Sequence, residues 1–172
     1  SEVNPVKDVP RIKFSNAREK FLTPAEAKRL MEAVEASDNS QLKHIVGLLM
    51  LTGARRNELL HAKWSHIDLE RKAWLIPTSK TGKHRYVPLS GAAIAIIEQL
   101  PKFKDCEWLL PNLDTKEPFV SIKHSWDTAR IEAKLPGLRL HDLRHSAASA
   151  MINSGVDLYT VGRILGHADH KS

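Results

Sequence analysis

The sequence predicts an α+β domain that is mainly α-helical and carries a small antiparallel β-sheet. Three observations predict this class: apolar residues recur at helical spacing over most of the chain, residues 64–89 have a strand-like composition, and helix-capping residues mark several boundaries. With 172 residues, 42% of them hydrophobic and 27% charged, the chain is long enough to bury one core. We therefore expect a single globular domain with an appended arm.

The N-terminal part divides into an arm and two helices. Residues 1–20 follow neither helical nor strand periodicity, so they are predicted to be an interdomain linker or arm. Thr23 and Glu26 have the spacing of a capping box, which begins the first helix. Residues 42–51 are almost continuously apolar but too short to cross a bilayer, which predicts a buried helix that Gly53 ends.

The middle of the chain is predicted to form the sheet. Residues 73–76 and 85–87 are strand-like, and the basic turn at 79–83 joins them into a hairpin. A sheet of two or three strands is expected, the third being residues 64–69.

Helices return in the C-terminal half. Residues 92–100 and 122–133 have helical spacing. Asp142 is predicted to cap a helix that runs to Asn153, and Asp157 to cap a short final helix.

Charge and cysteine content narrow the function. Lys and Arg number 26 against 20 Asp and Glu, a formal charge of +6 that suits a polyanionic partner. The single Cys106 excludes an internal disulfide and suits a reducing compartment. Neither a membrane-spanning run nor an N-terminal signal segment is evident, so a cytoplasmic protein without membrane contact is expected.

Five polar side chains stand at the ends of predicted elements, where they can converge on a cleft between rigid parts. They are Arg55, Lys80, His141, Arg144 and His167. Guanidinium groups bind the non-bridging oxygens of a phosphodiester, while histidine and lysine can donate or accept protons. This combination predicts phosphodiester chemistry.

These residues fall in four motifs that resemble the tyrosine recombinase, or phage integrase, family. The segments TGARRNELL, SKTGKHRYVPL, HDLRHSAAS and ILGH are similar to the family's motifs and stand in the family's order. The resemblance covers roughly residues 23 to 167. It implies the tyrosine recombinase catalytic-domain fold and a site-specific recombinase or integrase, encoded by a bacterium, phage or other mobile element.

The resemblance also implies roles for single residues. Arg55 and Arg144 would clamp the scissile phosphate and stabilise the charge of the transition state. Lys80 would protonate the departing 5′ oxygen, His141 would act as acid or base, and His167 would donate to a non-bridging oxygen. No metal and no other cofactor is implied, because the family conserves bond energy in a 3′-phosphotyrosyl link.

The tyrosine that forms this link is expected outside the chain. In the family it follows the LGH motif by about two helical turns, whereas this sequence ends at Ser172 and its tyrosines are Tyr86 and Tyr159. Tyr159 is predicted to pack within its short helix. Residues 21–172 are therefore expected to be a catalytic domain truncated before its nucleophile helix, and inactive alone.

The partner implied by the resemblance is double-stranded DNA. The full-length protein is expected to act as a homo-tetramer on two DNA sites, and the fragment to be a monomer in solution. The DNA target sequence and the direction of the reaction do not follow from the sequence.

Other charged residues receive plainer interpretations. Glu58, three residues after Arg55, matches an acidic position of the family and is expected to orient its neighbours, or to be a helix ion-pair member. We expect surface charges at Arg56, Lys83 and Arg85, whose role would not go beyond contact with DNA phosphates. Lys83 also remains a rival for the role of Lys80. His145 is expected to be structural and to bond backbone. No function is assigned to His61, His66, His84 and His124.

Three alternative functions fit parts of the sequence. His141 and His145 have the i, i+4 spacing of the two histidines in the HExxH motif of zinc metallopeptidases, and His167 would be a third ligand. Against zinc, Arg144 would lie beside the ion, and His141 is expected to precede the helix. A non-cleaving DNA-binding module explains the charge but not the set of catalytic residue types. A type IB topoisomerase shares the chemistry, but the chain length and motif wording favour a recombinase.

Overall fold

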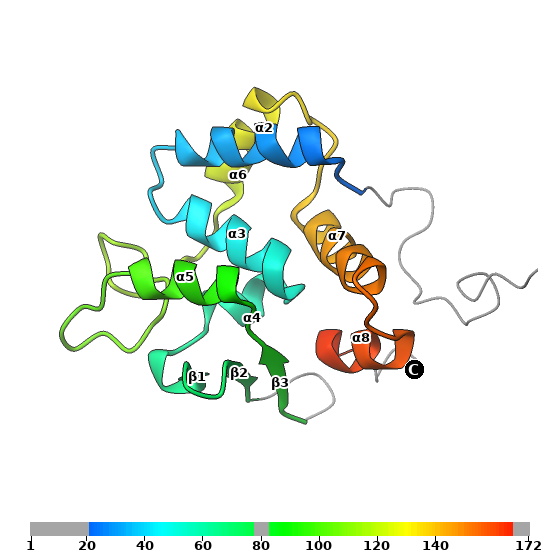
Figure 1. The fold of residues 1–172 in the computed structure, drawn as a ribbon. Coiled ribbons are helices and arrows are strands. Elements are labelled where there is room, and N and C mark those ends of the chain that lie inside the picture. Colours follow the sequence, from blue (N-terminus) through cyan, green and yellow to red (C-terminus); the bar gives the residue numbers. More distant parts are fainter. Residues whose placement is uncertain (1–20, 78–82, 167–172) are drawn as a thin grey trace, which may run out of the picture.

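The computed structural model describes residues 21–77 and 83–166, and it shows a helical domain with one antiparallel sheet (Figure 1). The helices are α2 (Pro24–Glu35), α3 (Leu42–Thr52), α4 (Arg56–Leu60), α5 (Gly91–Gln99), α6 (Lys123–Glu132), α7 (Leu140–Asn153) and α8 (Leu158–Leu165). The 3-10 helix η1 (Trp64–His66) precedes strands β1 (Ile67–Asp68), β2 (Ala73–Ile76) and β3 (Arg85–Pro88). The predicted fold class is confirmed.

Helix α3 forms the centre of the core. It contacts α2, α4, α5 and α7, and α6 packs against α2 (Figure 1). Its apolar residues face all these neighbours, which is why residues 42–51 lack a polar stripe. The large, fully buried side chains of this core include Leu30, Ile45, Leu48 and Leu143.

The sheet has the strand order β1-β2-β3, with both pairs antiparallel. The predicted hairpin is confirmed: Trp74 lies opposite Val87, and Leu75 lies opposite Tyr86. Trp74 and Val87 are buried on the inner face, as strand alternation requires. The third predicted strand is only partly right, because residues 64–66 form η1 and β1 is two residues long.

The capping predictions hold at both ends of the domain. At α2 the side chain of Thr23 accepts from the Glu26 backbone N–H, and the Glu26 carboxylate accepts from the Thr23 N–H. At α8 the Asp157 carboxylate accepts from the Thr160 N–H at 2.8 Å. None of the helices in residues 21–77 and 83–166 is both long enough and apolar enough to cross a bilayer.

The predicted start of α7 is wrong by three residues, since the N-cap is Arg139. Asp142 is not the N-cap but the third residue of the helix, where its carboxylate accepts from the backbone N–H of Arg139 at 2.8 Å. A carboxylate can complete a capping box from inside the helix as well as cap it from outside. His141 therefore lies in the first turn of α7 and does not precede it.

Helix α8 lies at the lower right of Figure 1, against α7 and β3. Its buried residues Val161 and Leu165 pack with Ala148 of α7 in a small separate cluster. Tyr159, predicted to pack, is instead 76% exposed. It lies on the side of the helix opposite Val161, where its ring contacts the Arg163 guanidinium.

Candidate active site

The end of α3 brings three helices close together. Gly53 has a φ of 72°, which ends α3 in the left-handed region, and a Cβ there would lie 2.4 Å from Leu165 of α8 and 3.2 Å from Ala147 of α7. Only glycine combines this backbone conformation with so close an approach. Arg55 follows as the N-cap of α4, with an extended backbone and a partly exposed side chain. The turn thus presents Arg55 where α3, α7 and α8 meet.

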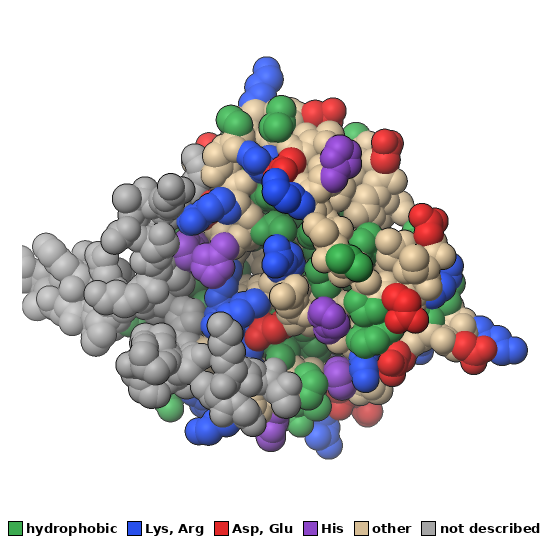
Figure 2. Space-filling view, turned by 180° about the vertical axis from the view of Figure 1, so that it is seen from behind, with side chains coloured by type: hydrophobic (Ala, Val, Ile, Leu, Met, Phe, Trp, Pro, Cys, Tyr) green, Lys and Arg blue, Asp and Glu red, His purple; other side chains and the backbone are tan. Residues whose placement is uncertain are grey.

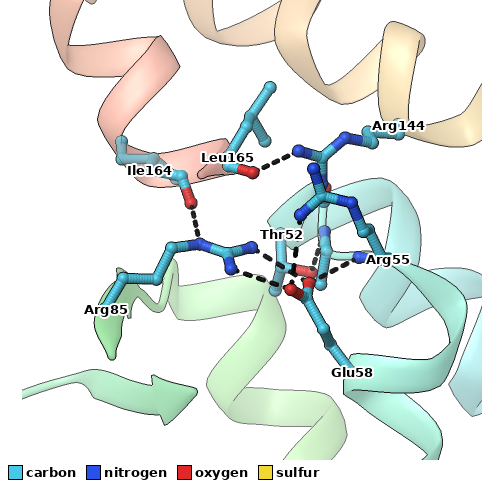
Figure 3. Close-up of polar contacts among 9 residues, drawn as sticks. Thr52, Arg55, Glu58, Arg85, Arg144, Ile164 and Leu165 are labelled. Carbon is cyan, nitrogen blue, oxygen red and sulfur yellow. Dashed lines mark hydrogen bonds and ion pairs between the residues drawn. The ribbon is translucent and has the colours of Figure 1, made fainter. Parts of the chain in front are cut away.

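Arg144 of α7 joins these helix ends from within. Its side chain is buried, with the residue only 3% exposed, and Nη1 donates to the carbonyl oxygen of Gly53 at 2.5 Å. Nη2 donates to the carbonyl oxygen of Leu165 in the last turn of α8 (Figure 3). Two backbone acceptors from separate elements thereby fix the plane of the guanidinium group.

Glu58 of α4 lies between two arginines. Its carboxylate accepts from the backbone N–H of Arg55 at 2.8 Å, and Arg55 Nη1 lies 3.4 Å from Oε2. Arg85 of β3 donates to it through both terminal nitrogens, at 2.8 and 3.0 Å. Burial raises the pKa of Glu58, but the hydrogen bonds from Arg85 and from the Arg55 backbone outweigh it and hold the pKa below its ordinary value. Glu58 is therefore a carboxylate at neutral pH.

The prediction that Arg85 is a surface charge is wrong. Its side chain is 11% exposed, and besides the bonds to Glu58 its Nε donates to the carbonyl oxygen of Ile164 at 2.9 Å (Figure 3). Strand alternation places Arg85 on the same inner face as Val87, and the Glu58 carboxylate supplies the counter-charge that makes burial tolerable. Arg56 and Lys83 are exposed, as surface charges should be, and their contact with DNA stays a prediction.

His141 lies in a positively charged environment. Partial burial lowers its pKa, and the charges of Arg144, Arg139 and Arg55 lower it further against the opposite effect of Asp142. His141 is therefore neutral at pH 7 and can accept a proton.

His145 lies one turn further along α7, and its ring centroid is 5.0 Å from that of His141. The residue is fully buried, and burial together with His141 lowers its pKa to about 4. This placement fits the predicted structural role, while a bond to backbone stays a prediction. Two other site residues, Lys80 and His167, lie outside the described residues.

The metal alternative changes with the corrected helix start. His141 and His145 do share one face of α7, so the argument that His141 precedes the helix fails. Arg144 still places a fixed cation beside the pair, which disfavours a divalent ion. Within residues 21–77 and 83–166 no three His, Cys, Asp or Glu residues are arranged to hold a metal ion.

A basic groove adjoins His141 between α6 and the start of α7. Its charged lining is Arg56, Lys123, Asp127, Arg130 and Arg139, and the neutral His141 lines it as well. Asp127 pairs with Lys123 at 2.6 Å and with Arg130 at 2.9 Å, so the groove remains basic overall. Figure 2 shows Lys and Arg side chains, with His among them, gathered on the face opposite that of Figure 1.

Sequence reasoning missed two parts of this site. Arg139 was not singled out, although its position three residues before Asp142 is the capping-box spacing; its Nη2 donates to Asp142 at 3.0 Å. The carbonyl groups of Gly53 and Leu165 are backbone atoms, which no residue pattern marks. The arrangement gathers cationic donors from α4 and α7 around one region, as an oxyanion with several acceptor oxygens requires.

Comparison with known sequences shows the family to which this chain belongs. Residues 20–172 match the sequence profile of the phage integrase family, and the chain belongs to that family. It is 34% identical over 183 residues to tyrosine recombinase XerC of Pediococcus pentosaceus, an alignment that covers 96% of this chain and 60% of the relative. It is 32% identical over 171 residues to the shufflon-specific DNA recombinase of Escherichia coli, covering 95% and 41%. The chain thus spans about half the length of the curated relatives it matches.

Solved structures agree on the fold. The crystal structure of XerA recombinase superposes with a TM-score of 0.72 at 27% identity, covering 87% of this chain and 56% of that one. The catalytic domain of bacteriophage HP1 integrase gives a TM-score of 0.69 at 27% identity, covering 89% and 83%. The fold is therefore that of a tyrosine recombinase catalytic domain.

Proposed function

We propose that this chain is the greater part of the catalytic domain of a site-specific recombinase or integrase, which cleaves and rejoins double-stranded DNA through a 3′-phosphotyrosyl intermediate. The observation that carries the proposal is the meeting of two arginines from separate elements. Arg144 is bonded to the carbonyl group of Gly53, two residues before Arg55. Family membership supplies the reaction type.

In this mechanism the arginines act through preorganisation. The Gly53 and Leu165 carbonyl groups hold Arg144, and Glu58 holds Arg55, before the phosphate arrives. Donors that are already aimed at the developing charge need no reorganisation in the transition state. Neutral His141 would accept or relay a proton, and Lys80 and His167 would serve the leaving and non-bridging oxygens.

The nucleophilic tyrosine is proposed to lie outside residues 1–172. Tyr86 is exposed and alternates with the inward-pointing Arg85 on β3, so it lies on the other face of the sheet. Tyr159 is exposed on the side of α8 opposite the buried Val161. Both tyrosines thus lie on faces of their elements that are turned away from the residues packed around Arg55 and Arg144.

The same proposal covers the organisation of the protein. Residues 1–20 are the linker or arm, and residues 21–172 are the catalytic domain without its nucleophile segment. The whole protein acts as a tetramer on two DNA sites, the domain alone is a monomer, and a bacterial cytoplasm is the compartment where its DNA lies. The groove beside His141, which includes Arg56, is suited to neighbouring backbone phosphates.

The test uses the full-length protein encoded by the gene and a nicked substrate that carries its DNA site, which can be selected from fragments of the source genome. A denaturation-resistant covalent complex should form in chelator and without ATP, while residues 1–172 alone should form none. Arg144→Ala should slow adduct formation by about 100-fold or more, the usual effect of removing one preorganised donor. Specific DNA binding without any adduct would instead identify a non-cleaving DNA-binding module.

A further inference from the structure

The last turn of α8 is held by two arginines at consecutive carbonyl groups. Arg85 of β3 donates to the Ile164 carbonyl oxygen at 2.9 Å, and Arg144 of α7 donates to that of Leu165. These are the last carbonyl groups of a helix, which have no partner within the helix and carry its partial negative charge. Cationic donors are therefore well matched to this end of α8.

Arg85 makes a second connection with the same guanidinium group. Its Nε donates to the Ile164 carbonyl oxygen of α8, while Nη1 and Nη2 donate to the two carboxylate oxygens of Glu58. Glu58 in turn accepts from the backbone N–H of Arg55 and lies 3.4 Å from its Nη1. A continuous chain of charge-assisted bonds thus runs from α8 through β3 to α4 (Figure 3).

The end of α8 closes tightly on this guanidinium group. Gly166 caps the helix with a φ of 74°, and a Cβ there would lie 2.9 Å from Cζ of Arg85 and 3.0 Å from Nε. A side chain at position 166 would displace Arg85, so the helix end is shaped to admit it. The close packing against Gly166 and the hydrogen bonds are independent observations, and both indicate that the Arg85 guanidinium group is held in one position.

We propose that Arg85 is a positioning residue that couples the docking of the last turn of α8 to the orientation of Arg55, with Glu58 as the link. The inference rests on the proposed function, in which Arg55 binds the scissile phosphate. In this proposal Arg85 acts on the phosphate only through Glu58 and Arg55. Arg144 donates directly to the Leu165 carbonyl oxygen in the same turn of α8. The position of this one helix end therefore determines the orientation of both phosphate-binding arginines.

The geometry requires an arginine and not merely a positive charge. Three N–H groups in one plane reach two carboxylate oxygens and a carbonyl oxygen at once, whereas a lysine offers a single nitrogen. Arg85→Lys therefore keeps the charge beside Glu58 but breaks the bridge to α8. This variant separates positioning from simple charge neutralisation.

The experiment measures single-turnover adduct formation by the full-length protein, together with DNA affinity. Arg85→Lys and Arg85→Gln should each slow the covalent step by about 10- to 100-fold, the scale of a misplaced catalytic group, and leave the Kd for DNA within about twofold. Gly166→Ala, which displaces Arg85 without removing it, should slow the step in the same direction. Rates are compared at a temperature where each variant is fully folded, so lost stability does not contribute.

The matched control is Arg71→Gln. Arg71 belongs to the same sheet region, but its side chain is 85% exposed and lies 3.8 Å from Asp68. It should leave the rate of adduct formation unchanged.

A pH series gives a readout that a merely structural residue would not move. Glu58 faces Arg55 from its own helix and Arg85 from β3. In Arg85→Gln burial and the bond from the Arg55 backbone N–H remain while the bonds and the charge of Arg85 are lost, so the pKa of Glu58 should rise. As the pH is lowered, the adduct rate of Arg85→Gln should therefore fall more steeply than that of the wild type.

The possible outcomes separate the two proposals. If the wild-type full-length protein forms no adduct, the proposed function is wrong. If the wild type forms it and Arg85→Lys is as fast as the wild type, the positioning role is wrong. Should Arg85→Gln fail to fold, Arg85→Lys and Gly166→Ala decide the matter by the same criterion.

Discussion

Helices α3 and α8 meet at Gly53 but are anchored in different ways. Seven residues of α3 are buried, and it packs against four other helices. Only Val161 and Leu165 are buried in α8, and its last turn is fixed by bonds from two arginines. Apolar burial supplies most folding stability, whereas a hydrogen bond to a charged group contributes only about 1.5–3 kcal/mol but fixes direction. The comparison suggests that α3 maintains the fold and that α8 maintains the geometry of the site.

The largest effect is expected in α3. Leu48→Ala removes a fully buried side chain from the centre of the core and should lower the free energy of unfolding by about 2–5 kcal/mol. Urea titration of residues 1–172 measures it. Leu51→Ala in the same helix removes a side chain at the surface and should cost less than about 1 kcal/mol. Equal losses would contradict the assignment of stability to the buried face of α3.

Protonation of the buried His145 should destabilise the folded protein at low pH. The folded state holds the pKa of His145 at about 4 against an ordinary 6.5, mainly through burial. Between these values the unfolded chain binds a proton that the folded chain does not, so stability is complete above 6.5 and falls as pH drops toward 4. A shift of this size corresponds to a loss of about 3 kcal/mol.

Denaturation at several pH values tests this prediction. The pKa values of three other histidines, His44, His66 and His141, are also lowered in the folded protein. Each of them therefore adds to the dependence of wild-type stability on pH. His145→Asn should flatten the dependence of stability on pH, and His124→Gln, which removes an exposed imidazole from α6, is the surface control. An unaltered slope in His145→Asn would show that His145 titrates normally in the folded protein.

Gly53→Ala tests the contact between the two helices. The substitution forces a side chain into a left-handed backbone and against Leu165, so stability should fall by about 1–3 kcal/mol. Hydrogen exchange should show greater loss of protection in α8 than in α3. Gly91→Ala is the control, because a Cβ at this first position of α5 meets no atom within 4 Å. Uniform loss across both helices would remove the distinction between them.

The sequence predicted those features of the fold that depend on neighbours in the chain. Capping at Thr23 and Asp157 and the stop at Gly53 involve residues within one turn, and all three are confirmed. The start of α7 was predicted wrongly because Asp142 can cap from either of two positions, and composition does not distinguish them. Tyr159 was misplaced because the buried face of so short a helix depends on what covers it.

In the site, too, local sequence patterns predicted some residues, whereas contacts between distant parts of the chain were not predicted. Motifs singled out Arg55, His141 and Arg144, and the structure places them where the ends of α3 and α8 meet α7. The burial of Arg85 depends on Glu58 in another element and on the carbonyl group of Ile164, which no local pattern indicates. Long-range polar contacts made through backbone atoms are the part that the sequence alone could not predict.

The smallest effect is expected from Tyr159→Phe. The residue is 76% exposed, and its ring contacts the Arg163 guanidinium, a contact that phenylalanine retains. Because the hydroxyl lies on the solvent side of α8, stability should change by less than about 0.5 kcal/mol. The full-length protein with this change should form the covalent DNA complex at the wild-type rate. If Tyr159→Phe abolishes the complex, the nucleophile lies within α8, the proposal of a tyrosine outside residues 1–172 is wrong, and α8 must turn over for catalysis instead of staying docked on Arg85 and Arg144.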